Sequence, residues 1–462
     1  MNLYDSKNTS QLSPFNNPID KSFGYHYNSN EIFICFNFVV SCGISYRGCA
    51  NGLGILSKIY PIRAPHYTTI RTWILKLGYF KLMQPKQRRT DWVFIIDLTI
   101  TIGVKKCMVI LGTSLSKLRS EGFGLTLKDV EVLHMSVLIH SNHKTVKQAL
   151  IDTSQSVGLP VEIISDYGSD VKKGIDEFCM EHKDVHFVYD VTHMTACKLK
   201  HIMEKDECWP EISKNIEKSK QQTKQGILSH LSPPCQRNKS RYLNLEGIIK
   251  WAGKMELYKE QIGMGQIEKD LMEYGQRDPS SKRRKIYNKS EAPQKSIELF
   301  NEKFGWIDQY KEPIQEYKQY MQIIGFVKKE IGRNGLSKKT IENIELGYEN
   351  SIMTSKACAF KEDLLAELKA YLPEQAQASR SFLGRSDIIE SLFGKYKYFN
   401  NECAMMGITQ SVLIMSAITS NIEVGKIKEA MEFCKMGAIF EWTKNNIGET
   451  VFSKRKKFMS LY

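Results

Sequence analysis

The stretch TDWVFIIDLTI, residues 90–100, sets a carboxylate, Asp97, directly after the continuously apolar run from Trp92 to Ile96. A short run this rich in aromatic and β-branched residues is typical of a strand that is covered on both faces. Asp97 then lies at or near the buried edge of a sheet, where an ionised carboxylate must be hydrogen-bonded, paired with a cation or bound to a metal. From this stretch alone, a structural aspartate that ends the strand is the simpler interpretation.

Further extended and helical patterns follow this strand. They predict strands at 107–113 and 130–138, a helix at 143–159, a strand at 161–166, a helix at about 170–181 and a strand at 185–190. A turn with Gly122 and Gly124 is expected between the second and third strands. The order β-β-β-α-β-α-β predicts an α/β fold with a mixed five-stranded sheet of the ribonuclease H-like type, whose first part spans residues 91–194.

The fourth strand ends in a second aspartate, Asp166, in IISDYGSD. The first and fourth strands are neighbours in this topology, so Asp97 and Asp166 are expected to converge although they are distant in the sequence. Two carboxylates that face each other repel unless cations lie between them. Carboxylate oxygens are hard ligands that suit Mg²⁺ or Mn²⁺. The pair therefore predicts a divalent metal site at this edge of the sheet.

A third acid is expected from a helix packed on the sheet, and GRSDIIESLFGKYKYF, residues 384–399, offers Glu390. Its apolar positions recur at helical spacing, and Lys397 follows two turns after Glu390 on the same side. Asp387 and Glu390 also have the D-x-x-E spacing of a capping box, which would use Glu390 to close the start of the helix instead. We favour the catalytic interpretation because the two strand-ending aspartates need a partner.

At these acids the chain resembles DDE transposases of insertion sequences. The resemblance rests on Asp97 in FIIDLT, Asp166 in IISDYGSD and Glu390 in IIESLFGKYK, and it covers about residues 91–190 and 380–420. It implies that the three acids hold Mg²⁺ or Mn²⁺ and catalyse cleavage of DNA at the ends of a mobile element, followed by strand transfer. It also implies a homo-oligomer assembled on double-stranded DNA, both element ends and target.

One group of these enzymes has a Tyr and an Arg before the Glu and a Lys seven residues after it. Lys397 fits that spacing and is expected to contact phosphate, whereas Leu383 and Ser386 stand at the positions of the Tyr and the Arg. Arg385 is the residue expected to have a role similar to that of the missing Arg. His193 in YDVTH, just past the fifth strand, is an auxiliary candidate for positioning water or phosphate, with a packed or capping histidine as the alternative.

The amino-terminal part of the chain has a helical pattern. After a loose polar segment at residues 1–25, residues 26–85 are expected to form a helix-turn-helix-like DNA-binding domain. Ser45 is the expected cap of a helix that runs to about residue 59.

A second amino-terminal helix is expected in HYTTIRTWILKLGYF, residues 66–80. One side of it is apolar, which leaves polar residues that include Thr69, Arg71 and Lys76 on the other side. A recognition helix presents such residues to a major groove. An ordinary helical bundle with a polar face is the alternative.

The interval between Asp166 and Glu390 is far longer than one helix and a connection need, and it indicates an insertion at about residues 195–379. Its segments have helical spacing with basic outer positions, so a helical insertion domain is expected, similar in placement to those of hAT-like transposases. The core would resume at 380–425, before a carboxyl-terminal helix and basic tail at 426–462. Three tryptophans of the insertion would stack on a flipped base or pack in its core: Trp209, Trp251 and Trp306.

Composition and charge point to a nucleic-acid partner. At 462 residues, with 42% hydrophobic and 10% aromatic residues, the chain is globular and is expected to contain several domains. Its 65 Lys and Arg against 51 Asp and Glu give a net charge of +14, which favours a polyanionic partner. Basic clusters lie at residues 81–89, 281–289 and 454–457. Each cluster alone suits a solvated loop, but together they suggest a path for a phosphate backbone.

Several classes of function are disfavoured. The sequence has no G-x-x-x-x-G-K-[ST] motif, so ATP dependence is not expected, and the apolar run at 32–42 is too short to cross a bilayer, so no membrane partner is expected. The 11 cysteines include no C-x-x-C pair and suggest reduced thiols in a cytoplasmic, DNA-associated protein. Two rival functions stay open: a related metal-dependent nuclease without strand transfer, and a DNA-binding regulator in which the acids are structural.

Overall fold

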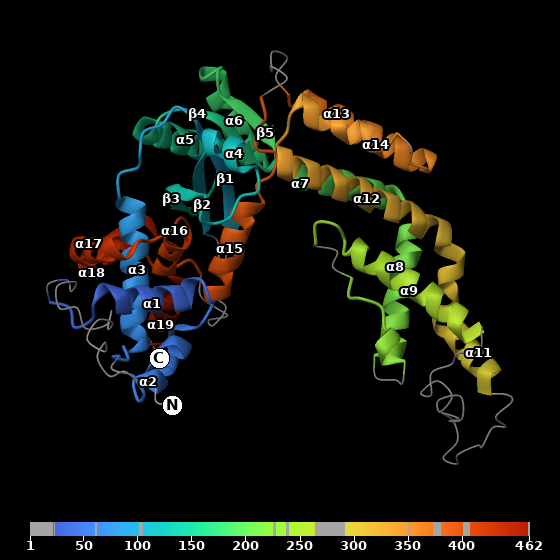
Figure 1. The fold of residues 1–462 in the computed structure, drawn as a ribbon, viewed down its shortest axis with the longest axis horizontal. Helices are drawn as coiled ribbons and strands as arrows, with labels where there is room; N and C mark the ends of the chain where they lie inside the picture. Colours follow the sequence, from blue (N-terminus) through green and yellow to red (C-terminus); the bar gives the residue numbers. More distant parts are fainter. Residues whose placement is uncertain are drawn as a thin grey trace, which may run out of the picture. The chain divides into compact units, whose positions relative to one another are not determined.

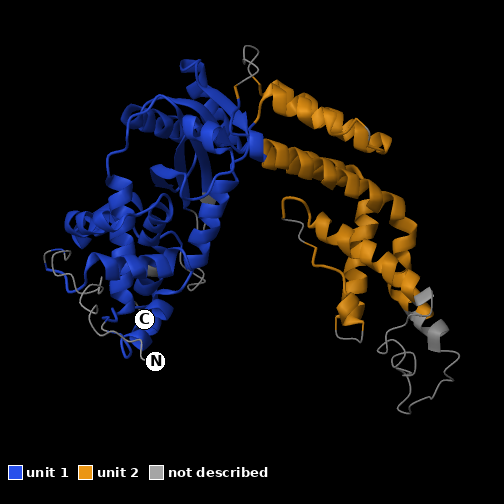
Figure 2. Ribbon diagram, in the orientation of Figure 1, with its two compact units in different colours: residues 1–190, 332–335, 381–462 blue, residues 191–331, 336–380 orange. Residues whose placement is uncertain are grey.

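The computed structural model describes residues 22, 24–60, 62–100, 105–224, 228–236, 240–263, 292–349, 351–372, 380–400 and 407–460. The chain divides into two compact units (Figure 2). Unit 1 comprises Met1–Asp190, Gly332–Gly335 and Ser381–Tyr462, and unit 2 comprises Val191–Ile331 and Leu336–Arg380. Most of the predicted loose segment at 1–25 and the whole basic cluster at 281–289 lie outside the described residues. Within the ranges given above, no helix combines the length and the apolar character needed to cross a membrane.

A mixed five-stranded sheet lies at the centre of unit 1 (Figure 1). Its strands are β1 (Trp92–Ile100), β2 (Lys106–Ser114), β3 (Glu131–Leu138), β4 (Pro160–Ser165) and β5 (His186–Tyr189). They lie in the order β3-β2-β1-β4-β5. β1 pairs antiparallel with β2 and parallel with β4. The predicted mixed sheet of five strands, and the predicted pairing of the first strand with the fourth, are therefore confirmed.

Helices cover one face of this sheet through an apolar core. The helices in this part of the chain are α4 (Leu115–Glu121), α5 (His143–Val157) and α6 (Ser169–Glu181). Phe94 and Ile96 of β1 are buried together with apolar residues of α5 and α6. Because side chains alternate along a strand, Ile95 and Asp97 point to the opposite face.

The short helix α4 lies where the sequence predicted only a glycine turn. Ser114, the last residue of β2, caps it with its side chain. Asp91 accepts hydrogen bonds from Ser114 Oγ at 2.5 Å and from the Ser116 N–H at 3.2 Å, and Arg89 Nε donates to its other oxygen at 2.9 Å. Burial raises the pKa of the Asp91 carboxyl, but these hydrogen bonds outweigh burial and hold the pKa well below its ordinary value. Asp91 is thus a structural carboxylate directly before β1, whereas Asp97 lies within this strand.

Helices from both ends of the chain complete unit 1. They are α1 (Ser29–Val40), α2 (Tyr46–Leu56), α3 (Tyr67–Met83), α15 (Asp387–Asn400), η4 (Gln410–Leu413), α16 (Ile414–Ile418), α17 (Val424–Phe433), α18 (Met436–Asn446) and α19 (Val451–Met459). The predicted cap at Ser45 is confirmed, since its side chain accepts a hydrogen bond from the Gly48 N–H at 3.0 Å.

α3 is a central helix of unit 1. It packs against α1, α2, α16, α17 and α18, and its residues 73–78 are all buried. At Gly78 it comes so close to η4 that a Cβ would collide with the Leu413 carbonyl oxygen. The amino-terminal helices therefore pack in one unit with the carboxyl-terminal helices, because residues 73–78 of α3 are buried among them, and the DNA-binding domain expected for residues 26–85 stays a prediction.

The described part of unit 2 consists of helices and their connections. The helices are α7 (Val191–Lys205), α8 (Cys208–Thr223), η2 (Ser229–Leu231), α9 (Leu245–Gly263), α11 (Ala292–Phe304), η3 (Gly305–Tyr310), α12 (Lys311–Asn334), α13 (Lys338–Leu346) and α14 (Ser355–Ala370). Trp251 and Trp306 stack with ring centroids 6.1 Å apart in an aromatic core. Their indole N–H groups donate to Leu231 O and Ser219 Oγ, each at 2.9 Å. Trp209 packs edge-on against a buried tyrosine of α12, so all three tryptophans have packing roles.

The basic stretch at residues 81–89 is used inside unit 1. Lys81 Nζ donates to two backbone carbonyls in the turn after α16. Lys86 Nζ lies 3.3 Å from a carboxylate oxygen of Glu131, and Arg89 pairs with Asp91. Three of its basic residues therefore have partners within the fold, and the path for phosphates stays a prediction.

Lys81 makes the stability of the protein depend on pH. Burial, together with the nearby charge of Lys86, lowers the pKa of Lys81 to about 7. Since a lysine pKa in an unfolded chain is about 10.4, the unfolded chain binds a proton between these pH values that the folded chain has released. The free energy of unfolding should therefore rise with pH across this window, by at most about 1.4 kcal/mol per pH unit, and this contribution is lost as the pH falls to about 7.

Urea unfolding between pH 7 and 10 measures this effect. The wild type should gain stability across the window relative to Lys81→Met, which has no proton to release. Lys58→Met, at an exposed position after α2, is the control and should follow the wild type. Parallel curves for the wild type and Lys81→Met would contradict the prediction.

Candidate active site

Neighbouring parallel strands bring Asp97 and Asp166 together. Asp97 lies within β1, which continues to Ile100 instead of ending at the aspartate as predicted, because the strand stays paired with β2, and Asp166 directly follows β4. Ile95 of β1 pairs with Ile164 of β4 in the parallel register, and each aspartate lies two residues farther along its chain. The two aspartates therefore stand level on strands that lie about 4.8 Å apart, and on the same face of the sheet. Both residues are partly exposed, so these carboxylates are accessible to a ligand.

Backbone N–H groups orient both carboxylates. The Leu98 N–H donates to Asp97 Oδ1 at 2.6 Å, and the Gly168 N–H donates to Asp166 Oδ1 at 3.2 Å. A side chain at Gly168 would place its Cβ 3.2 Å from that same Asp166 oxygen. Glycine at this position therefore lets the loop close around the carboxylate.

Tyr167, the residue directly after Asp166, fixes this loop on the sheet. Its ring stacks on Tyr189 of β5, with ring centroids 3.7 Å apart and planes at 9°. Lys172 Nζ lies 5.2 Å from the centroid of the Tyr167 ring. The role of Tyr167 could not be predicted from the sequence, because its stacking depends on β5 being the neighbour of β4.

The helix α15 carries Glu390 and packs against β1. Ile389 and Leu392 are buried, whereas Glu390 is partly exposed. Because α15 begins at Asp387, Asp387 and Glu390 are its first and fourth residues. A capping box uses the residue before the helix and the third helical residue, which here are Ser386 and Ile389. These bounds do not match the capping-box alternative for Glu390.

Lys397 and Arg385 lie on either side of Glu390 in the sequence. Lys397 is exposed, two turns beyond Glu390 on α15. Arg385 pairs with Asp387 at the start of α15, and its guanidinium lies against Gly332, where a Cβ would clash with it. In this structure Arg385 therefore supports the start of α15, and the DNA contacts expected of both residues stay predictions.

The other predicted residues lie away from the strand ends. Arg71 is exposed and Thr69 partly exposed near the start of α3. Lys76 is only 8% exposed, and its Nζ donates to the hydroxyl of Tyr25. The prediction that Lys76 projects outward is wrong, because packed helices surround α3 at this point. His193 lies in the first turn of α7 and belongs to unit 2, whereas the three acids belong to unit 1, so its auxiliary role stays a prediction.

No role was predicted from the sequence for two buried carboxylates. Glu162 lies within β4 and is 0% exposed, and Asp190 directly follows β5 and is 1% exposed. The sequence feature that could have revealed Glu162 as a buried carboxylate is its charge within the otherwise apolar strand PVEIIS. A charge at such a position needs hydrogen-bond donors from another part of the chain.

The carboxylates of Asp97 and Asp166 are suited to bind a hard cation. Two carboxylates on neighbouring strands supply oxygen ligands of the kind that Mg²⁺ and Mn²⁺ prefer. Among the described residues, no three or more His, Cys, Asp or Glu side chains gather in a group that could hold a metal ion. Asp97 and Asp166 are therefore the pair that the fold brings together, and the participation of Glu390 is a proposal.

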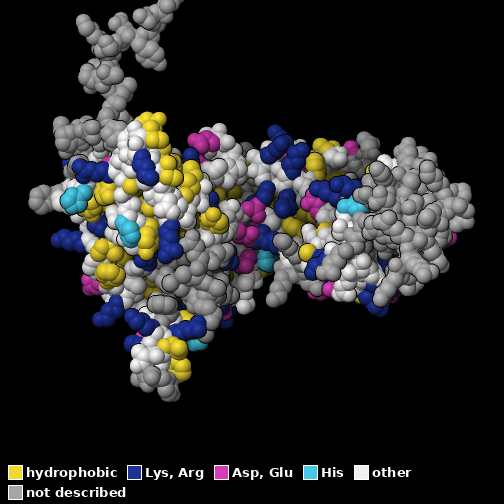
Figure 3. All heavy atoms as spheres, turned by 90° about the horizontal axis from the view of Figure 1, so that it is seen from below, with side chains coloured by type: hydrophobic (Ala, Val, Ile, Leu, Met, Phe, Trp, Pro, Cys, Tyr) yellow, Lys and Arg dark blue, Asp and Glu magenta, His cyan; other side chains and the backbone are white. Residues whose placement is uncertain are grey.

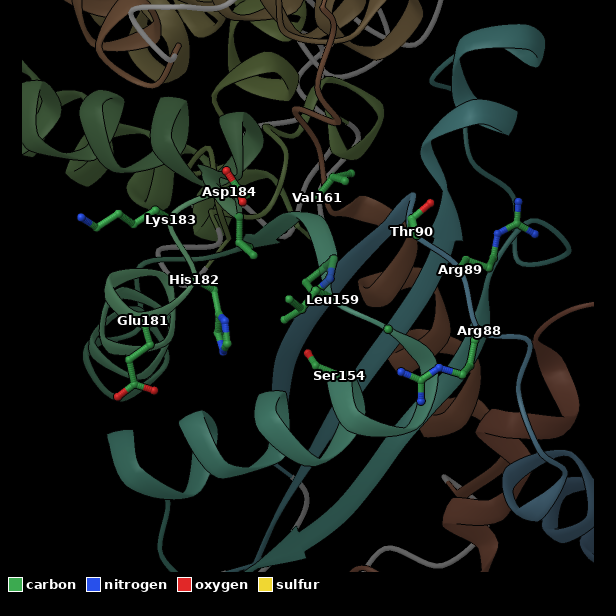
Figure 4. A pocket seen from close by; sticks show the side chains of 13 residues that line it. Arg88, Arg89, Thr90, Ser154, Leu159, Val161, Glu181, His182, Lys183 and Asp184 are labelled. Carbon is green, nitrogen blue, oxygen red and sulfur yellow. The ribbon is translucent and has the colours of Figure 1, made fainter.

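A cavity of about 700 Å³ lies elsewhere in unit 1 (Figure 4). It is lined by residues next to the amino-terminal ends of β1, β4 and β5, which include Thr90, Pro160 and Val185. Because Asp97 and Asp166 lie toward the carboxyl ends of β1 and β4, this cavity is not part of the candidate site.

Positive side chains are spread over the surface. Figure 3 shows Lys and Arg side chains scattered among apolar ones on one face of the molecule. The basic cluster at 454–457 lies in α19 and is exposed. Lys457 pairs with Glu449 at 2.7 Å, and Lys105 Nζ, just before β2, donates to the Glu449 carbonyl oxygen at 3.1 Å. The start of α19 is thus tied to the β1–β2 hairpin, beyond Asp97 along β1.

Comparisons with known proteins find no sequence match and a distant structural likeness. No family model matches the chain, and no curated protein sequence matches it. Among solved structures, the chain is similar to the Drosophila P element transposase strand transfer complex, with 13% sequence identity over 87% of this chain and 94% of that chain, and a TM-score of 0.37. A TM-score this low does not establish a shared fold, so the proposals that follow are built on this chain's own residues.

Proposed function

We propose that this protein is a DDE-type transposase, which cuts DNA at the ends of a mobile element and joins the freed 3′ ends to target DNA. The observation that carries the proposal is the level placement of Asp97 and Asp166 on adjacent parallel strands, with the Glu390 helix packed against the first of them. The order β3-β2-β1-β4-β5 supports assignment of the sheet to the ribonuclease H-like type.

Mg²⁺ or Mn²⁺ is the proposed cofactor. Asp97 and Asp166 are the residues that would hold it, with Glu390 of α15 as the third carboxylate. When bound, the metal would activate the attacking oxygen and stabilise the leaving oxygen of the phosphodiester.

Backbone N–H groups and a lysine near this site would orient the carboxylates and the DNA. The backbone N–H groups of Leu98 and Gly168 fix one oxygen of the Asp97 and Asp166 carboxylates. Lys397 lies two turns from Glu390 on the same side of α15, about 10 Å along the helix, and its exposed ammonium is placed to bind a DNA phosphate. No side chain becomes covalently attached to DNA in this scheme.

DNA binding by the amino-terminal helices is tested with two residues of α3 that differ in exposure. Arg71→Ala should weaken binding to a duplex that carries the element's terminal repeat, and should lower the slope of log affinity against log salt by about 1, because one phosphate contact is lost. Lys76→Met is the matched control: it should lower the melting temperature and leave the salt slope unchanged, because Lys76 is buried. Unchanged affinity and slope in Arg71→Ala would refute the contact.

The proposed function is tested by nicking and strand transfer. The purified protein should nick supercoiled plasmid in the presence of Mg²⁺, and it should join terminal-repeat DNA, taken from inverted repeats that flank the gene, to a target plasmid. Nicking without joining would indicate a nuclease. Binding without nicking would indicate a regulator and refute the proposal.

A further inference from the structure

The chain leaves unit 1 after Asp190, re-enters it briefly at Gly332–Gly335, and returns to it for its last part at Ser381. The return segment, residues 381–386, leads directly into α15. Ser386 Oγ donates a hydrogen bond to Asp190 Oδ2 at 2.7 Å, so the point of departure and the point of return are joined inside unit 1. Asp190 is 1% exposed and Ser386 is 5% exposed, which means that water does not compete for this bond.

A second buried carboxylate holds the same segment. Glu162 Oε2 accepts a hydrogen bond from the backbone N–H of Leu383 at 3.0 Å. Beside Glu162 in the register, the ring of His186 meets Phe382 edge-on, with ring centroids 5.3 Å apart. A buried carboxylate is costly unless donors reach it, and for both Glu162 and Asp190 a donor comes from the return segment.

Asp190 also stands in line with the candidate metal-binding aspartates. The parallel register of β4 and β5 makes Asp190 level with Asp166, as the register of β1 and β4 makes Asp166 level with Asp97. The three lie on the same face because side chains alternate along each strand. The return segment therefore meets the sheet at one end of this row, four residues before Glu390.

We propose that Asp190 and Glu162 are positioning residues for the transposase reaction: they anchor the return segment so that α15 holds Glu390 beside the row of aspartates. The inference rests on the proposed function and adds residues that touch neither metal nor DNA. Both are buried and accept hydrogen bonds from the return segment, whereas Asp97 and Asp166 are partly exposed. Misplacing a reacting group by about 1 Å can cost about 100-fold in rate, so loss of the anchor should be visible in turnover.

A double-mutant cycle on the Asp190–Ser386 pair tests the anchor. Ser386→Ala and Asp190→Ala should each lower the turnover number for Mg²⁺-dependent cleavage by up to about 100-fold, with DNA affinity unchanged. The double variant should be no slower than either single variant, because both changes remove the same hydrogen bond. Asp190→Asn should retain far more activity than Asp190→Ala, since its amide oxygen still accepts the Ser386 hydroxyl.

Two results would overturn the proposal. If Asp190→Asn is as inactive as Asp97→Asn while Ser386→Ala is active, Asp190 is a metal ligand and not a positioning residue. If the losses in the two single variants add in the double variant, the residues act independently. Glu162→Gln provides a second check, because its amide oxygen still accepts the Leu383 N–H, and it should be more active than Glu162→Leu.

Hydrogen exchange separates the anchor from the function. In Asp190→Ala and Ser386→Ala, backbone amides of residues 383–390 should exchange faster than in the wild type, while those of β1 and β4 should not change. This measurement needs no activity. If the variants exchange faster but the wild type does not cleave DNA, the anchor is supported and the transposase proposal is refuted. If exchange is unchanged in the variants, the anchor itself is refuted.

Discussion

Asp97→Asn and Asp166→Asn should each bind DNA as the wild type does and lose Mg²⁺-dependent cleavage by at least about 1,000-fold. An amide keeps the shape of the carboxylate and removes the charge that holds the metal. The several kcal/mol of transition-state stabilisation that a metal supplies would then be lost, and about 4 kcal/mol corresponds to this factor in rate. Plasmid nicking measures cleavage and a gel-shift titration measures binding, with each variant first checked for folding by thermal melting.

Asp91→Asn is the matched control, because Asp91 directly precedes β1, the strand that carries Asp97. Asp91 holds the turn into α4 through Ser114, Ser116 and Arg89. Its replacement should therefore lower the melting temperature and leave the cleavage rate of the folded protein nearly unchanged. Normal cleavage by Asp97→Asn or Asp166→Asn would eliminate the proposed site.

Glu390→Gln is expected to abolish cleavage at a small cost in stability. The amide still suits the start of a helix, so the free energy of unfolding should fall by only about 1 kcal/mol. Cleavage should nevertheless collapse, because the third carboxylate that would complete the metal site is gone. Nicking rates at increasing Mg²⁺ concentration, compared with thermal melting of the same preparations, measure both effects.

Asp387→Asn tests the same helix start without changing the proposed ligand. It weakens the ion pair with Arg385 and should lower stability while turnover stays close to that of the wild type. If Glu390→Gln and Asp387→Asn were equally active, Glu390 would be a structural residue of α15, and Asp97 and Asp166 would lack their third partner.

The elements of the sheet could be predicted from local patterns. The apolar run before Asp97 and the strands that end near Asp166 and Asp190 appear in the structure close to their predicted bounds. Chain order then indicated that β1 and β4 are neighbours, so the approach of Asp97 to Asp166 could be predicted as well. α4 was missed because its start depends on Ser114, a residue that also reads as the end of a strand.

The surface of the amino-terminal helices could not be predicted in the same way. An apolar side on α3 was visible in the sequence, but the helices that cover its remaining sides come from the other end of the chain. Lys76 is therefore buried against Tyr25, while Arg71, nearer the start of the helix, is exposed.

By itself the sequence determined where most strands and helices form, and that Asp97 and Asp166 follow apolar runs while Glu390 lies on a helix, because these patterns extend over only a few residues. Only the tertiary structure decided which polar groups are buried and what they bind. Glu162 finds its donor 221 residues away and Asp190 finds its donor 196 residues away. A buried carboxylate is stabilised by the hydrogen-bond donor that packs against it in the folded chain. The residues next to the carboxylate in the sequence do not indicate which donor that is.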